Sequence, residues 1–186
     1  MTSQNRSHFE LMSITTRRGD DGSTDLLFGK RISKDAPRME AIGSVDELNA
    51  ALGLVRAEAD GETEEVIDGL QALLVGLMGE LAVVPEDAER YAQSDYPSIG
   101  DEEVERVEQL GREIESAGVK FEGWARPGAN GNRAGACLDM ARTVCRRVER
   151  RVLELGEEVS NTAIPLFLNR LSDLLWLLAR RTEGDS

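Results

Sequence analysis

One stretch of the chain, residues 141–155, has the apolar spacing of a helix that is buried along one side. It reads A-R-T-V-C-R-R-V-E-R-R-V-L-E-L. Apolar residues recur at steps of three and four: Leu138, Ala141, Val144, Cys145, Val148, Val152 and Leu155. This period places them in one stripe along an α-helix, and such a stripe has to pack against other elements. The stretch therefore predicts a core helix over about 134–155, ended by Gly156.

The same period predicts four further helices. Ser44 followed by Glu47 matches a capping box, so we expect the first helix to begin at Ser44. The others are expected over about 63–84, 101–117 and 162–181. Residues 85–100 are expected to form a polar loop, and no β-strand pattern of any length appears. These features predict an all-α fold, a bundle of five helices.

Length and composition limit the class of protein. A chain of 186 residues suits one domain, with 1–13 as a polar tail, 14–35 as a glycine-containing loop and 44–181 as the bundle. The net charge of -13 disfavours nucleic acid as a partner, because binding its phosphates requires cations. The leucine-rich stretch 166–179 is interrupted by Asn169, Arg170 and Asp173, so we expect no membrane span.

The two cysteines and the N-terminal residues indicate the compartment. Cys137 and Cys145 would lie about 12 Å apart on one helix, which is too far for a disulfide. No apolar segment typical of a secretion signal is visible at the N-terminus. We therefore expect a reducing, cytoplasmic location.

Charged residues form a second stripe on the helix over 134–155. Arg142, Arg146, Glu149 and Arg150 recur at i, i+4, i+7 and i+8 and therefore share a face. Five arginines lie between positions 142 and 151 of this acidic chain. Like charges one turn apart repel, so the stripe is either ordinary exposed surface or a site for something anionic. Arginine favours forked contacts to phosphate or carboxylate.

Residues 15–35 form a second candidate for anion binding. They read T-T-R-R-G-D-D-G-S-T-D-L-L-F-G-K-R-I-S-K-D. Their glycines permit backbone shapes in which successive N–H groups can surround an anion, and Thr16, Ser23, Thr24 and Lys34 add hydroxyls and an ammonium. A turn-rich leader without a binding role is the plain alternative. The stretch is not a P-loop, because G-x-x-x-x-G-K-[ST] is absent.

Several catalytic classes are excluded by the scarcity of histidine. The one histidine is His8, in the tail, so neither a di-iron bundle with two Glu-x-x-His motifs nor a serine triad can be built. Two cysteines eight residues apart do not make a zinc site. The remaining arginines, lysines, hydroxyls and backbone amides suit the binding of a polyphosphate whose reaction partner brings its own reactivity.

Four stretches, in this order, resemble the PduO-type corrinoid adenosyltransferases (ATP:cob(I)alamin adenosyltransferases). They are T-R-R-G-D-D-G-S-T (16–24), R-I-S-K-D-A-P-R-M-E-A-I-G-S-V-D-E-L-N-A-A-L-G (31–53), A-R-T-V-C-R-R-V-E-R-R-V (141–152) and L-N-R-L-S-D-L-L (168–175). The resemblance implies a ferritin-like bundle of the cobalamin adenosyltransferase type, assembled as a homotrimer with active sites at subunit interfaces. It also implies an activity: the cobalt of cob(I)alamin attacks C5′ of ATP, which gives adenosylcobalamin and releases triphosphate.

The resemblance implies a role for each matching residue. The ATP-binding residues would be Thr16, Arg17, Arg18, Gly19, Thr24, Asp25, Lys34, Arg146, Arg147, Glu149, Arg150 and Asn169. Mg²⁺ would bind through the ATP phosphates and not at a dedicated protein site. Asp46 and Arg142 would form an ion pair that shapes the site, and Arg170 and Asp173 would support the pocket. The resemblance further suggests a flavoprotein reductase and a cobalamin-dependent acceptor enzyme as protein partners.

The chain departs from the family pattern before the arginine-rich helix. The family usually has F-x-x-P-G-G there, and its phenylalanine covers the lower face of the corrin. Here the segment is W-A-R-P-G-A, so Trp124 takes that position, with Phe121 as a nearby rival, and Asp139 stands where the family often has histidine. These departures keep open a non-catalytic alternative, an ATP-binding corrinoid chaperone or regulatory bundle. A purely structural bundle is the third alternative.

Overall fold

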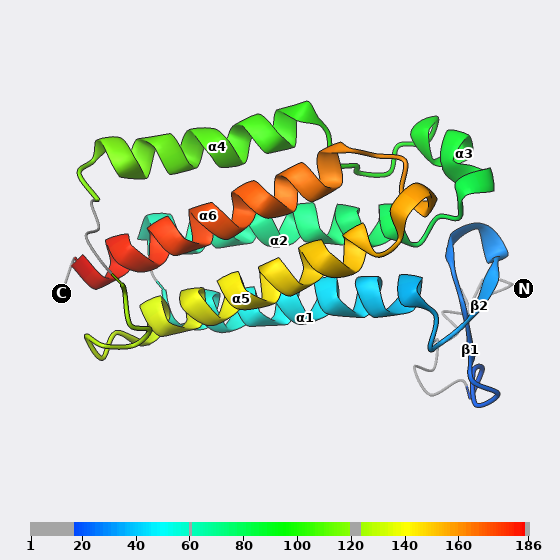
Figure 1. Cartoon of the computed structure of the whole chain (residues 1–186), viewed down its shortest axis with the longest axis horizontal. Coiled ribbons are helices and arrows are strands. Elements are labelled where there is room, and N and C mark those ends of the chain that lie inside the picture. The colour runs from blue at the N-terminus through cyan, green and yellow to red at the C-terminus, as the bar shows by residue number, and fades with distance from the viewer. Residues whose placement is uncertain (1–16, 60, 120–123, 185–186) are drawn as a thin grey trace, which may run out of the picture.

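A computed structural model describes residues 17–59, 61–119 and 124–184 (Figure 1). Five long helices lie roughly along one axis: α1 (Pro37–Glu58), α2 (Gly61–Leu81), α4 (Asp101–Ser116), α5 (Arg133–Leu153) and α6 (Ala163–Gly184). Helix α1 packs against α2 and α5, and α6 packs against α5 and α4. The expected all-α class is confirmed, and the ends of α2, α4, α5 and α6 lie within three residues of those predicted.

The described residues also contain short helices and strands that the sequence pattern did not predict. A sixth helix, α3 (Ala88–Ala92), lies in the stretch expected to be a loop, so the expected count of five helices was wrong. Strands β1 (Ser23–Asp25) and β2 (Arg31–Ser33) pair antiparallel, and 3₁₀ turns occupy η1 (Leu27–Gly29), η2 (Pro85–Asp87) and η3 (Gly156–Glu158). Elements of three to five residues are shorter than the windows in which apolar periodicity is detectable.

Helix α1 begins at Pro37 and not at Ser44, so the predicted capping box was wrong. Proline suits the first turn of a helix because the first N–H groups there have no partner within the helix. Ser44 is buried inside α1, where its hydroxyl donates to the Glu40 carbonyl at 2.8 Å. A serine inside a helix satisfies itself in this way as readily as a serine at a helix start, so the sequence pattern alone did not distinguish the two.

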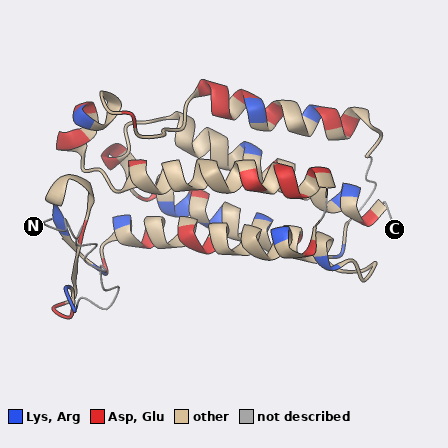
Figure 2. Cartoon of the chain, turned by 180° about the vertical axis from the view of Figure 1, so that it is seen from behind, with Lys and Arg blue, Asp and Glu red and all other residues tan. Residues whose placement is uncertain are grey.

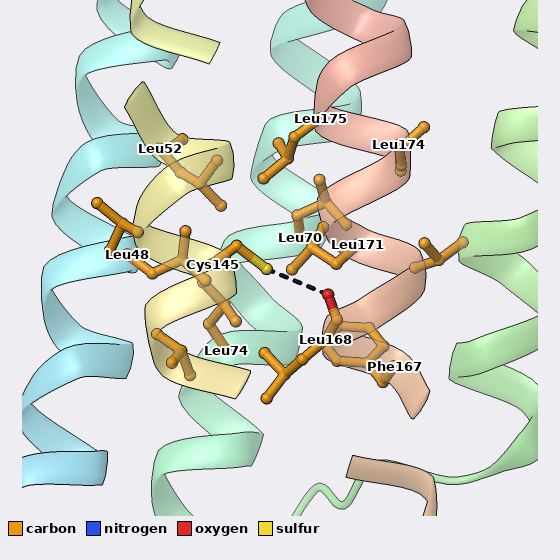
Figure 3. Close-up of a cluster of buried hydrophobic side chains, with 14 of the residues drawn as sticks. Leu48, Leu52, Leu70, Leu74, Cys145, Phe167, Leu168, Leu171, Leu174 and Leu175 are labelled. Atoms are coloured by element: carbon orange, nitrogen blue, oxygen red, sulfur yellow. Dashed lines mark hydrogen bonds between the residues drawn. The ribbon is translucent and has the colours of Figure 1, made fainter. Parts of the chain in front are cut away.

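The apolar stripe predicted for the arginine-rich helix is confirmed, because all seven of its residues are buried. Figure 3 shows leucines of α1, α2 and α6 pointing into the same interior around Cys145 of α5. The Cys145 thiol donates to the Leu168 carbonyl of α6 at 3.3 Å. Helix α5 is therefore held between α1 and α6, and its polar faces can only lie to the sides of that contact.

A buried arginine fixes the end of the bundle where α1 begins. Arg38 donates to the carbonyls of Leu81 and Val83, both at 2.8 Å, which lie at the end of α2. It also donates to the Glu158 carbonyl at 3.0 Å and to the Glu158 carboxylate at 3.1 Å. Leu81 and Glu158 are the last residues of α2 and η3, and Val83 lies just beyond α2. Carbonyls at helix ends lack partners within their helices, so one guanidinium satisfies several acceptors at once.

No single helix among the described residues is both long and apolar enough to cross a membrane. By length and composition alone, one pair passes that test, Gly61–Leu81 with Pro85–Ala92, and it is bent by 108° at its break.

The two free cysteines differ in burial, and this predicts a difference in reactivity. Burial raises the pKa of the Cys145 thiol well above its ordinary value, and the nearby Glu149 carboxylate adds to the effect. The thiolate is the reactive form, so in the folded protein at pH about 8 we expect iodoacetamide to modify Cys137 and spare Cys145. Mass spectrometry of tryptic peptides measures both, and unfolding in guanidinium should remove the difference. Equal labelling rates in the folded protein would contradict the burial of Cys145.

Candidate functional site

The arginines of α5 point to two sides of the helix. Arg147 and Arg151 face α1, where Arg147 pairs with Glu47 and Arg151 lies 3.4 Å from Glu40. Glu149 lies on the other side, because it accepts a hydrogen bond from Asn169 of α6 at 3.2 Å. The arginines that the resemblance assigns to ATP are thus divided, because Arg147 faces α1 whereas Arg146 and Arg150 share the stripe of Glu149.

Arg146 and Arg150 are the exposed members of the stripe that contains Glu149. Arg150 donates to the Arg146 carbonyl at 2.8 Å, so it stays close to its own helix. Within the described residues neither guanidinium has an ion-pair partner at a carboxylate. Two exposed cations one turn apart remain uncompensated there, which is the arrangement expected of an anion-binding surface.

Helix α6 supplies the neighbouring polar residues. The Asn169 side chain lies beside Glu149, and its amide oxygen Oδ1 accepts from Arg170 at 2.8 Å. Asp173 is exposed one turn further along α6. Asn169 of α6 therefore lies against Glu149, which shares its stripe on α5 with Arg146 and Arg150.

The N-terminal loop has a defined internal structure. The Lys34 ammonium donates to the Gly19 carbonyl at 2.8 Å, and the Lys34 N–H donates to the Gly22 carbonyl at 2.9 Å. Gly19 is buried and has a φ of +121°, and a Cβ there would lie 2.8 Å from the Ser23 carbonyl oxygen. Only glycine fits this position without a shift of the backbone. Lys34 thus helps to form the loop as well as supplying charge to it.

Alternating charges hold the hairpin that follows. The Asp25 carboxylate lies 3.2 Å from Arg18 and 3.0 Å from Arg31, so it bridges the two guanidinium groups. Thr24 is half-buried in β1, opposite Ile32 of β2. Arg17 is exposed with a φ of 58°, and Thr16 lies outside the described residues.

The loop and hairpin lie at the end of the bundle where α1 begins and α5 ends (Figure 1). They are attached near the end of α2 and to α3: the Leu27 N–H donates to the Ala82 carbonyl at 3.0 Å, and the Arg90 guanidinium lies 4.0 Å from the centre of the Phe28 ring. Lys34 belongs to this loop, whereas Arg146 and Arg150 belong to α5. One chain therefore carries two parts of the predicted phosphate site, one on the loop and one on α5.

The ion pair expected between Asp46 and Arg142 does not form within the described chain. Arg142 instead contacts Asp139, one turn earlier on its own helix, at 3.3 Å. Asp139 is 2% exposed, and its other oxygen accepts from Arg180 of α6 at 2.6 Å. Asp46 is exposed. A carboxylate already fixed on the same helix is the nearer partner for Arg142.

Asp139 and Arg180 are buried polar residues that the sequence reading did not place in the site. A signal was present for Asp139, which lies between Leu138 and Arg142 at the edge of the apolar stripe. A charge at a buried position requires a partner. Arg180 gave no such signal, because it lies among the last charges of α6.

The loop before α5 is open to solvent. Trp124 is 80% exposed, and Phe121 lies outside the described residues. Nearby, a cavity of about 670 Å³ is lined by Val119, Arg126 and Asn130 on one side and by Arg180, Arg181 and Glu183 of α6 on the other. An exposed indole close to a cavity of this kind is available for contact with a large flat ligand.

Comparison with known proteins identifies the family. The model of the cobalamin adenosyltransferase family matches residues 14–182. The chain belongs to this family. It is 37% identical over 180 residues to the corrinoid adenosyltransferase PduO of Salmonella typhimurium, which covers 94% of this chain and 51% of that protein. It is also 37% identical to a cobalamin adenosyltransferase of Cupriavidus metallidurans, with 91% of this chain and 88% of that protein covered.

Solved structures agree with this assignment. A phenylalanine-to-alanine variant of a PduO-type ATP:corrinoid adenosyltransferase from Lactobacillus reuteri, complexed with cobalamin and ATP, is 28% identical with a TM-score of 0.80. It covers 92% of this chain and 94% of its own. An arginine-to-lysine variant of the enzyme from that organism, complexed with ATP, has a TM-score of 0.79 at 26% identity, with the same coverage. The chain spans about half the length of the PduO proteins that it matches. The family resemblance drawn from the four sequence stretches is confirmed.

The buried pair of Asp139 and Arg180 predicts a large loss of stability when one partner is removed. Arg180→Met leaves Asp139 buried with Arg142 alone, and we expect the free energy of unfolding to fall by about 3–5 kcal/mol. Urea denaturation followed by circular dichroism measures this. Arg133→Met is the matched control, since the Arg133 side chain is 80% exposed where it pairs with Glu58, and it should cost less than about 1 kcal/mol. Equal losses would contradict a special role for the buried pair.

Proposed function

We propose that the chain transfers the 5′-deoxyadenosyl group of ATP to the cobalt of cob(I)alamin or a related corrinoid. The observation that carries this proposal is the exposed pair of Arg146 and Arg150, which have no ion-pair partner among the described residues and share a stripe with the Asn169-bonded Glu149, in a chain of this family. An electron pair of Co(I) forms the new bond to C5′, and the C5′–O bond breaks with its electrons leaving on triphosphate. No protein base is required for this exchange, so the protein contributes binding, orientation and charge.

The triphosphate-binding site would combine residues of the loop and of the helices. The proposed contacts are Thr16, Arg17, Arg18, Gly19, Thr24, Asp25 and Lys34 from the loop, and Arg146, Arg147, Glu149, Arg150 and Asn169 from α5 and α6. Arg147 would have to exchange its contact with Glu47 for phosphate. Mg²⁺, bound through the phosphates of ATP, would neutralise part of the charge that develops on the leaving triphosphate.

Assembly into a homotrimer would bring the two halves of the site together. Lys34 lies on the loop at the end of the bundle and the arginines lie on α5, and the loop of one copy is proposed to meet the arginines of another. Asp46 and Arg142 would likewise pair between copies, with Arg170 and Asp173 supporting the pocket. A flavoprotein reductase, a cobalamin-dependent acceptor enzyme and a cytoplasmic location remain predictions.

Arg146→Ala tests the proposed contact between Arg146 and the triphosphate of ATP. In an anaerobic assay with ATP, Mg²⁺ and chemically reduced cobalamin, we expect kcat/KM to fall by about 10- to 100-fold, the loss of one charge-assisted hydrogen bond. The absorbance change on formation of adenosylcobalamin is the measurement. Arg151→Ala is the control, because Arg151 faces α1 and pairs with Glu40 and Glu154. Binding of ATP and cobalamin by the wild-type chain without turnover would favour the non-catalytic alternative instead.

Trp124 is proposed to cover the lower face of the corrin, where its ring would exclude an axial ligand and make the cobalt easier to reduce. Trp124→Ala should then slow conversion from cob(II)alamin with a reductant far more than conversion from pre-reduced cob(I)alamin. Trp124→Phe keeps an apolar ring and should retain most of the wild-type rate from both. If Trp124→Ala slows both reactions equally, Trp124 does not have this role.

A further inference from the structure

A chain of hydrogen bonds crosses three helices and ends beside the arginines of α5. Glu108 of α4 accepts from Arg170 Nε of α6 at 2.7 Å. Arg170 Nη1 donates to Asn169 Oδ1 at 2.8 Å, and Asn169 Nδ2 donates to Glu149 Oε1 of α5 at 3.2 Å. Acidic residues predominate along α4 (Figure 2), but Glu108 differs from the more exposed Glu105, since its side chain is 28% exposed and that of Glu105 is 66% exposed.

The chemistry of the four groups determines which way the Asn169 amide faces. A guanidinium only donates hydrogen bonds and a carboxylate only accepts them. The amide oxygen must therefore face Arg170 and the amide nitrogen must face Glu149. A flipped amide would lose both hydrogen bonds and would place like groups against each other. The donor on one side of the Asn169 amide and the acceptor on the other thus select one of two amide orientations that have nearly the same shape.

This orientation suits an anion. Asn169 Nδ2 carries two hydrogens, one of which is donated to Glu149, and no described residue accepts the second. The donor end of the amide is thereby kept on the side of Glu149, in the stripe of Arg146 and Arg150, and the acceptor end is turned away from it. A carbonyl oxygen in that place would repel phosphate.

We infer that Glu108 is a positioning residue for the nucleotide site, acting through Arg170 to hold the Asn169 amide with its donor end toward the triphosphate. The inference rests on the proposed function and assigns a part in it to α4, a helix that none of the four family stretches includes. Arg112 lies 3.5 Å from the other oxygen of Glu108, so the carboxylate is held from both sides. Arg170 in turn is held by Glu108 at one nitrogen and by Asn169 at another.

The test measures the affinity of the full chain for Mg·ATP by isothermal titration calorimetry. Glu108→Ala removes the acceptor for Arg170, and we expect the Kd to rise by about tenfold, the effect of losing one charge-assisted hydrogen bond. Glu108→Gln keeps an acceptor oxygen and should restore the Kd to within about threefold of wild type. Glu105→Ala is the matched control: it removes the same charge from the same helix and breaks a contact with Arg112. Arg112 also contacts Glu108, but the hydrogen bond between Glu108 and Arg170 stays intact in this variant. It should leave the Kd unchanged.

A double variant separates positioning from general damage. If Glu108 acts through Asn169, then Glu108→Ala should have no further effect on the Kd in an Asn169→Ala background. Equal Kd values for Glu108→Ala and Glu105→Ala, or a full additional loss in the double variant, would overturn the inference while the proposed function stands. Failure of the wild-type chain to bind ATP would overturn both. Should Glu108→Ala not fold, a Glu108→Gln variant as weak as the Asn169→Ala variant would overturn the inference, because the acceptor oxygen would then not suffice.

Discussion

Burial of the apolar stripe of α5 between α1 and α6 is the contact on which the rest of the structure depends. All seven residues of that stripe are removed from solvent, and each is matched by leucines or other apolar side chains of the neighbouring helices. Once the apolar side is buried, the rotation of α5 about its axis is fixed, and so are the directions in which its other sides face. Arg147 and Arg151 face α1, and Glu149, which shares its stripe with Arg146 and Arg150, contacts α6. The hydrophobic contact thus decides which cations are paired and which remain exposed for an anion.

The charges of this protein fall into two energetic classes. Asp139, Arg180 and Arg38 are buried and hydrogen-bonded, and removing one partner leaves a group without solvent or a counter-charge. The pairs along the α1 and α5 contact, such as Arg133 with Glu58, are largely exposed and contribute little to stability. Their effect is to orient side chains. Burial therefore stabilises the ends of the bundle with a few polar contacts, while the exposed stripe is left available for binding.

The chemistry that we propose makes modest demands on side-chain reactivity and strict demands on position. Cobalt supplies the nucleophile and triphosphate is the leaving group, so the chain has to hold two large substrates at a defined distance. We propose that the loop at one end of the bundle and the arginines of α5 come together when two copies meet. The network from Glu108 to Glu149 fits the same requirement, since it fixes an amide donor without taking part in the reaction.

The sequence alone determined the helices, the buried stripe of α5, the exclusion of histidine-dependent sites and the family, because periodicity and motifs are properties of neighbouring residues. It did not determine where α1 begins, that α3 and the hairpin exist, or that Arg142 contacts Asp139 in place of Asp46. Nor could it reveal that Arg147 pairs with Glu47 of α1. It also could not reveal that Glu108 contacts Arg170, a residue 62 positions later in the sequence, and through it the Asn169 amide. Contacts of this kind depend on the register and rotation of one helix against another. Those are set by how the apolar side chains of all the helices fit together, so only the tertiary structure decided them.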